Sequence, residues 1–162
     1  MLLEILTIGV YGFTEASFFN SITQSGTDCF VDIRQRRGLR GAQYAFANST
    51  RLQNQLELNG IKYRHLQLLA PTEEVRETQR IADQQQCNSK RSREKLSQSF
   101  IKAYTECCLS CYQPGLVVKL LPIETQRPLL FCVERLPDAC HRSLVADWLS
   151  KSSNVPVRHI HP

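Results

Sequence analysis

A cysteine, a histidine and an arginine follow one another at positions 140 to 142, and Cys132 lies eight residues before this group. Apolar residues recur at helical spacing from 144 to 149, so Cys140, His141 and Arg142 are predicted on the first turn of a helix. A helix start presents unpaired backbone N–H groups and the positive end of the helix dipole. Because such a position lowers a thiol pKa and attracts anions, the pattern predicts a site for a negatively charged ligand.

The residues before this helix predict how it is positioned. Leu129 to Val133 is a short apolar run, typical of a strand buried on both faces, and 134 to 139 is a polar turn that contains Pro137. The unit is therefore a strand, a six-residue loop and a helix. Glu134, in the loop, is a candidate general base together with Cys140 as a candidate catalytic thiolate.

Other roles are open for these residues. Cys140 could be a small buried residue that packs the helix start. Cys132 could be the redox partner of Cys140 or could contact the ligand. Arg142 either binds the anion or forms an ion pair with Glu134 or Asp32, and the sequence leaves both open.

A second group of charged residues follows another predicted strand, 29 to 33. Asp32 and Arg34 alternate about Ile33, so both are expected on one face, and Arg34 should point to the ligand edge. Two basic patches are candidates for phosphate contacts: Arg36, Arg37 and Arg40 in the first, and Lys90, Arg91 and Arg93 in the second. Solvated loops are the alternative for these arginines and lysines.

The rest of the chain alternates strand and helix patterns. Strands are predicted at 2–8, 29–33, 61–66, 129–133 and 157–160, and helices at 14–26, 49–60, 72–85, 94–111 and from 141 onward. The run 116–121 fits either a helix or a strand. This order predicts one Rossmann-like three-layer αβα domain over 1–162, with a mainly parallel sheet of about five strands and 129–133 at its centre. Trp148 is expected to pack the last helix onto that sheet.

Parallel sheets bind ligands at the carboxyl ends of their strands, where the strand order reverses. Four loops are expected to meet there: 9–12, which contains Tyr11 as a candidate ligand contact, 34–40, 68–72 and 134–142. His141, Arg142, Cys132, Asp32 and Arg34 complete the predicted ligand-binding set.

The pattern L-L-x-C-x-E-x-x-P-x-x-C-H-R, which begins at Leu129, resembles the signature of the bacterial domain-of-unknown-function family 488. Shorter matches include Val31-Asp-Ile-Arg34 and Gly60-Ile-Lys-Tyr63. The resemblance implies a small Rossmann-like domain and no settled reaction. The chain departs from the family at Leu69-Ala-Pro-Thr72, where members often have Leu-Gly-Gly.

Composition narrows the class of protein. The chain has 162 residues and a net charge of +5, but the stretches 34–40 and 90–95 hold 8 of its 20 basic and 1 of its 15 acidic residues. The remainder has 12 basic and 14 acidic residues, so the positive charge is local. The 7 cysteines and the absence of a secretion signal or membrane span predict a cytoplasmic protein with reduced thiols and no membrane partner.

Other chemistry is not indicated. The C-x-x-C of Cys108 and Cys111 continues the apolar stripe of a helix together with Cys107, which favours core packing over a metal site. No nucleotide-binding glycine motif, zinc-protease motif or nucleophile elbow is present, so we expect no cofactor and no metal. His159 and His161 would join a metal site only through tertiary structure.

The sequence thus favours an α/β domain that binds a small phosphate- or nucleotide-like anion, with thiol-assisted chemistry at Cys140 as an added hypothesis. Two alternatives stay open: a nucleic-acid-associated module that uses both basic patches, and an interaction protein without catalysis. Few aromatic residues lie among the patches, which weakens the case for single-strand binding.

Overall fold

All five strands form one parallel sheet in the computed structural model, which describes residues 1–162. The strands are β1 (Ile5–Gly9), β2 (Cys29–Asp32), β3 (Lys62–His65), β4 (Pro128–Cys132) and β5 (Val157–Ile160). Their order is β3-β2-β4-β1-β5, so β4 is central and pairs in parallel with both β2 and β1. Every residue of β4 is buried, as its unbroken apolar run predicts.

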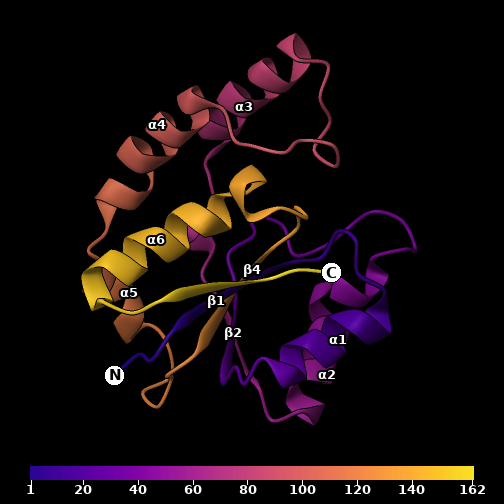
Figure 1. Ribbon diagram of the computed structural model, residues 1–162, viewed down its shortest axis with the longest axis vertical. Helices are drawn as coiled ribbons and strands as arrows, with labels where there is room; N and C mark the ends of the chain where they lie inside the picture. The colour runs from indigo at the N-terminus through magenta and orange to yellow at the C-terminus, as the bar shows by residue number, and fades with distance from the viewer.

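Six α-helices surround the sheet: α1 (Glu15–Gln24), α2 (Ser49–Leu58), α3 (Glu73–Gln85), α4 (Gln98–Cys107), α5 (Pro114–Lys119) and α6 (His141–Ser153). Figure 1 shows α1 and α2 on one face of the sheet and α5 and α6 on the other, while α3 and α4 project beyond it. Helix α6 packs on β1, β4 and β5, and α3 packs on α4. The predicted α/β class, the layers and the parallel sheet are therefore confirmed.

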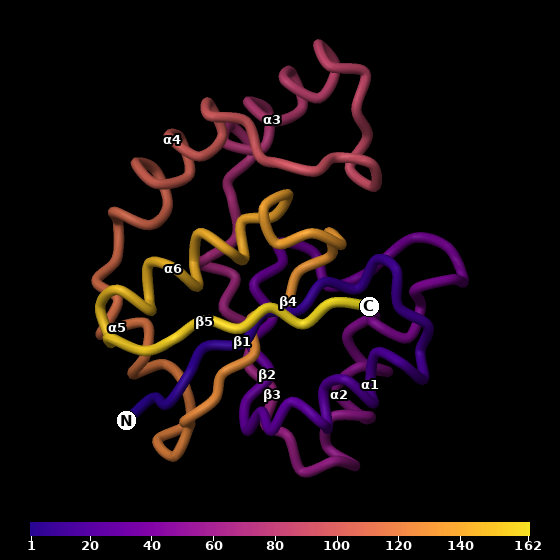
Figure 2. The backbone as a smooth tube through the Cα atoms, viewed as in Figure 1, coloured from indigo at the N-terminus to yellow at the C-terminus, as the bar shows by residue number.

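At the centre of the sheet, the connections after two adjacent strands lead to helices on opposite faces. Strand β2 leads to α2 on one face, and its neighbour β4 leads to α6 on the opposite face. The connections that follow these adjacent strands diverge, which opens a crevice at their carboxyl ends. The backbone in Figure 2 has its N-terminus at the amino edge of the sheet and its C-terminus at the carboxyl edge.

Three helix boundaries differ from the predictions. Helix α4 begins at Gln98 instead of near 94, because Ser97 Oγ accepts a hydrogen bond from the backbone N–H of Phe100 at 3.1 Å and caps the helix there. The helix predicted over 94–111 also ends early, at Cys107, and Pro114 is the first residue of a separate helix, α5, a position that proline favours. The run 116–121 is therefore helical through Lys119, and α2, predicted over 49–60, ends at Leu58.

Trp148 packs against the core from α6 but is only partly buried. The apolar residues of α6 that are buried against the sheet are Val145, Ala146 and Leu149. The helix therefore docks through its smaller apolar residues, and Trp148 covers the margin of that contact.

Helix α1 offers a direct test of local stability. Thr14 Oγ1 accepts from the backbone N–H of Ser17 at 3.1 Å, and Ser17 Oγ accepts from the backbone N–H of Thr14 at 3.0 Å, which forms a capping box. Thr14→Ala should lower the free energy of unfolding by about 1 kcal/mol, because it leaves a helix N–H unpaired. Thr23→Ala, an exposed change on the same helix, should cost clearly less in the same urea denaturation series. Equal midpoints for the two variants would contradict the capping role.

Candidate functional site

The loop after β4 brings the predicted chemical residues together. It contains a short 3₁₀ turn, Pro137–Ala139, and ends at Cys140, which is the N-cap of α6. Cys140 has extended backbone angles, and its carbonyl oxygen accepts a hydrogen bond from Ser143 Oγ at 3.0 Å. Helix α6 begins at His141, so His141 and Arg142 lie on its first turn as predicted, whereas Cys140 precedes the helix as its N-cap.

Two thiols and one imidazole form the centre of the site. Cys132 Sγ lies 3.8 Å from His141 Nδ1, and Cys140 Sγ lies 4.0 Å from the same nitrogen. All three side chains are buried. Among all residues described, these three are the only group of histidine, cysteine, aspartate or glutamate whose ligand atoms cluster closely enough for one metal ion.

The two thiols are electrostatically unequal. Burial opposes ionisation of Cys140, but the Cys132 thiol, Arg142 and His141 outweigh it and hold the pKa of Cys140 well below its usual value. The interaction with Cys140, together with burial, raises the pKa of Cys132 well above its usual value. The pair therefore holds one negative charge more readily on Cys140 than on Cys132.

Glu134 closes one side of this group. Its Oε2 lies 3.4 Å from Cys132 Sγ, whereas Oε1 lies 3.3 Å from the Arg93 guanidinium and 3.5 Å from Lys90 Nζ. Burial, followed by the negative charge of Cys140, raises the pKa of Glu134. Arg93 is itself held by Asp83 at 2.7 Å, so α3 is tied to the β4 loop through one arginine.

Arg34 and Asp32 form a buried pair. Two nitrogens of the Arg34 guanidinium donate to the two Asp32 carboxylate oxygens at 2.9 and 2.7 Å, and the guanidinium also lies over the Phe131 ring. Tyr63 donates to the same carboxylate at 2.9 Å, and burial, then the Asp32 charge, raises the pKa of Tyr63 to about 12. Arg34 still borders the cavity, but most of its charge is already matched by Asp32.

Arg142 does not point into the cavity. It is 0% exposed and donates to the backbone carbonyl oxygens of Glu134 and Arg135 at 2.6 and 3.0 Å. Neither ion pair expected as an alternative, with Glu134 or with Asp32, forms through the side-chain carboxylates. Arg142 therefore holds the loop that carries Glu134. Its positive charge also lowers the pKa of Cys140, although its side chain does not line the cavity.

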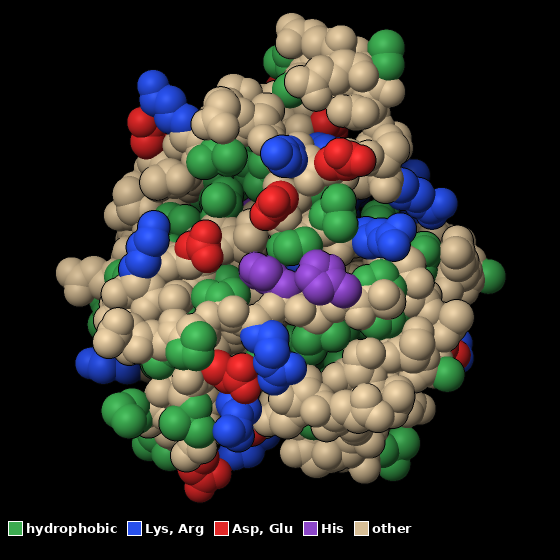
Figure 3. Space-filling view, in the orientation of Figure 1, with side chains coloured by type: hydrophobic (Ala, Val, Ile, Leu, Met, Phe, Trp, Pro, Cys, Tyr) green, Lys and Arg blue, Asp and Glu red, His purple; other side chains and the backbone are tan.

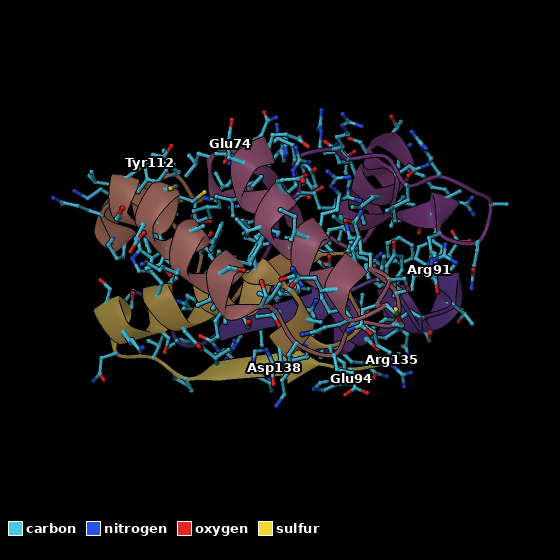
Figure 4. The ribbon with its side chains drawn as sticks, turned by 90° about the horizontal axis from the view of Figure 1, so that it is seen from above. Glu74, Arg91, Glu94, Tyr112, Arg135 and Asp138 are labelled. Atoms are coloured by element: carbon cyan, nitrogen blue, oxygen red, sulfur yellow. The ribbon has the colours of Figure 1, made fainter.

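Tyr11, predicted as a ligand contact, is not among the residues that line the cavity between the loops after β2 and β4. Its ring lies 5.1 Å from that of Tyr44, and the Arg91 guanidinium lies 5.5 Å from the Tyr11 ring centre. Arg91 comes from the connection between α3 and α4, so this contact joins that connection to the loops after β1 and β2. Figure 4 shows Arg91 and Arg135 toward the same end of the molecule, away from Tyr112.

A cavity of about 690 Å³ lies between the loops after β2 and β4 and the helix α3. Cys132, Glu134 and His141 border it, whereas Cys140 and Arg142 do not. In all, seven basic and three acidic side chains line it: Arg34, Arg36, Arg40, Arg76, Arg80, Lys90 and Arg93, with Glu73, Asp83 and Glu134. The two basic patches therefore face one space, although Arg37 and Arg91 lie outside its lining. On the face in Figure 3, basic and acidic side chains are instead interspersed.

Helix α3 supplies cavity residues that are not among the predicted site residues. Gln79, one of its few buried residues, donates to Asp83 Oδ1 at 2.7 Å and accepts from the backbone N–H of Ser97 at 2.8 Å. Gln79 and Asp83 are four residues apart, so they share one face of the helix. The weak apolar stripe of 73–85 is the signal for this arrangement, because the helix turns a polar face to the cavity.

The C-x-x-C segment lies elsewhere. Cys108 is buried at the end of α4, and Cys107 and Cys111 are exposed. All seven cysteines are free. His159 lies on β5, where Thr7 Oγ1 and His159 Nδ1 are 2.8 Å apart, outside the thiol group. No helix is long and apolar enough to cross a membrane.

The residues that line the cavity lie within the match to one family. The family model described as "Domain of unknown function DUF488" matches residues 15–149. The chain belongs to this family. The DUF488 match spans β2, β3, β4 and the start of α6, and thus every residue that borders the cavity. Comparison with curated proteins and with solved structures found no match.

Proposed function

We propose that this DUF488 protein binds a small phosphate- or nucleotide-like anion in the cavity between the β2 and β4 loops. The observation that carries the proposal is the excess of seven basic over three acidic side chains around one space of about 690 Å³. A volume of this size suits a small-molecule ligand. The position, at the carboxyl ends of adjacent strands whose connections diverge, is where parallel sheets bind ligands.

The basic side chains that line the cavity differ in whether a carboxylate already pairs with them. Arg76 pairs with Glu73, Arg80 with Glu77, and Arg93 with Asp83 and Glu134. Arg36 and Arg40 border the cavity, are exposed and have no carboxylate partner. These two arginines are therefore the residues that we expect to contact the anion first, whereas Lys90 lies 3.5 Å from Glu134 Oε1.

Thiol-assisted chemistry is the second part of the proposal. Cys132 borders the cavity and is the thiol that a bound anion would meet, whereas Cys140 lies behind it and is 1% exposed. Glu134, at 3.4 Å from Cys132 Sγ, is the adjacent carboxyl group. A reducing compartment such as the cytoplasm, where thiols stay reduced, suits this arrangement.

A charge-reversal experiment tests the anion site. We expect Arg36→Glu/Arg40→Glu to weaken binding of inorganic phosphate and adenosine monophosphate about tenfold or more in calorimetric titrations, which corresponds to about 1.4 kcal/mol. The matched control is Lys102→Glu/Lys119→Glu, which makes the same change in net charge at exposed residues that do not border the cavity. Equal loss of affinity in both double variants would show that binding is not in the cavity.

The nucleic-acid alternative keeps one supporting observation, because both basic patches face the same space. A single-stranded oligonucleotide is therefore the third probe in the same titrations. Several phosphate contacts would give a log–log salt slope of roughly −0.7 per contact. An oligonucleotide that binds no tighter than adenosine monophosphate, with a slope near that of one contact, would leave a small anion as the ligand.

A further inference from the structure

The two thiols and the imidazole have the spacing of a metal centre. The Sγ atoms of Cys132 and Cys140 lie 3.8 and 4.0 Å from His141 Nδ1, and all three atoms lie within 4.8 Å of one another. In tetrahedral zinc sites, with Zn–S near 2.3 Å and Zn–N near 2.0–2.1 Å, sulfur and nitrogen ligands are roughly 3.6 Å apart. The side chains therefore need to move only slightly to share one ion.

The second ring nitrogen of His141 gives independent support. Nε2 lies 3.2 Å from the backbone carbonyl oxygen of Ile33. A carbonyl oxygen only accepts, so Nε2 must carry the proton, and in the neutral ring Nδ1 presents its lone pair to both sulfurs. Metal-binding histidines are held by this kind of outer hydrogen bond, which fixes the tautomer and orients the ring.

One buried cation and one carboxyl group lie beside the cluster. Arg142, the next residue after His141, is fully buried and donates only to backbone carbonyl oxygens, so no carboxylate neutralises it. Glu134 is occupied on Oε1 by Arg93 and Lys90, whereas its Oε2 faces Cys132. The cluster thus has two sulfur atoms and one nitrogen atom that can bind a thiophilic metal ion. The carboxyl group of Glu134 lies beside them but is not needed as a metal ligand.

We propose that Cys132, Cys140 and His141 bind one zinc-class divalent ion, whose fourth position faces the cavity and accepts an oxygen of the bound anion. Two sulfurs and one imidazole suit Zn²⁺ and exclude Mg²⁺ and Ca²⁺, which prefer oxygen ligands. Three protein ligands with one open position are typical of catalytic zinc sites. Only the identity of the fourth ligand rests on the proposed function, because the three protein ligands do not depend on it.

Cobalt is the probe for this site, since Co²⁺ replaces zinc and gives a near-ultraviolet charge-transfer band when thiolates bind it. The background is the full chain with Cys87, Cys107 and Cys111, the three exposed cysteines, changed to serine. We expect one Co²⁺ per chain, a thiolate band, and its loss when one equivalent of Zn²⁺ is added. Cys140→Ser, Cys132→Ser and His141→Gln should each weaken Co²⁺ binding at least about 100-fold.

The matched control is Cys29→Ser, which changes a buried cysteine outside the cluster and should keep the band and the affinity. If a cluster variant fails to fold, the metal site can still be tested on the background protein, in which the cluster is intact. Zn²⁺ should protect Cys132 and Cys140, but not Cys29 or Cys108, from alkylation detected by peptide mass spectrometry. No thiolate band, or equal alkylation with and without Zn²⁺ of Cys132, the thiol that borders the cavity, would overturn the metal site.

Phosphate titrations with and without Zn²⁺ separate this inference from the proposed function. Phosphate binding without any metal binding would reject the metal site alone. Metal binding without phosphate binding would reject the anion site and its oxygen as the fourth ligand, and keep the three-residue metal centre.

Discussion

Gly9→Ala should cost about 3 kcal/mol or more of unfolding free energy, although it adds only one methyl group. A Cβ atom at Gly9, the last residue of β1, would lie 1.8 Å from the carbonyl oxygen of Glu134 and 2.9 Å from Arg142 Nη1. The first contact is with backbone, which no rotamer change relieves, so the loop after β4 must move. Overpacking of this kind costs typically 1–3 kcal/mol, and more where backbone is displaced.

Displacement of the loop after β4 should change the geometry of the site as well as the stability of the protein. Glu134 O accepts from Arg142 at 2.6 Å, so a shift of this loop breaks the hydrogen bond that positions Glu134 and the start of α6. Gly115→Ala is the matched control, because nothing lies within 4 Å of its Cβ and it sits in helix α5. That variant should be neutral or more stable by up to about 1 kcal/mol in urea denaturation. A Gly9→Ala protein as stable as Gly115→Ala would show that the loop does not pack against β1.

The sequence predicts the parts of this site that lie within one segment. The apolar run before Glu134, the proline turn and the helical spacing from 144 onward place Cys140 at the start of α6, because each feature depends on neighbours in the chain. The central position of β4 follows from its apolar residues on both faces. These local and compositional signals carry most of the fold.

The sequence could not predict which partners meet across the fold. Arg142 was assigned to an anion or to a carboxylate, whereas its partners are backbone carbonyl oxygens, which have no residue-type signal. The two basic patches are about 50 residues apart in the chain, and only the path of α3 over the β2 loop makes them line one cavity. The grouping of Cys132 with His141 likewise depends on how the loop folds back, and no residue spacing in the sequence indicates it.

Arg142→Met should lower the free energy of unfolding by about 3–5 kcal/mol. The guanidinium is fully buried, and its removal leaves the carbonyl oxygens of Glu134 and Arg135 without their donors. Each unsatisfied buried acceptor costs about 1–3 kcal/mol. Methionine keeps much of the apolar volume, so the loss is assigned to the hydrogen bonds and not to a cavity.

Arg142→Lys separates the charge of Arg142 from its geometry. Lysine keeps one positive charge but cannot donate to both carbonyl oxygens with a planar fork, so its stability should fall between wild type and Arg142→Met. A readout that does not depend on stability is the pKa of His159, which burial, and then the charge of Arg142, lower from the usual 6.5. The imidazole pKa, followed by NMR, should rise in Arg142→Met and stay low in Arg142→Lys.

The sign of the pH effect follows from that lowered pKa. Because the folded state disfavours the charged imidazole, the contribution of neutral His159 to stability is fully present above pH 6.5 and is lost as the pH falls through the lowered pKa. Arg142→Met should weaken this dependence, since the charge that helps to depress the pKa is gone. A His159 pKa that is identical in wild type, Arg142→Lys and Arg142→Met would show that Arg142 acts only through its hydrogen bonds to the loop and not through its buried charge.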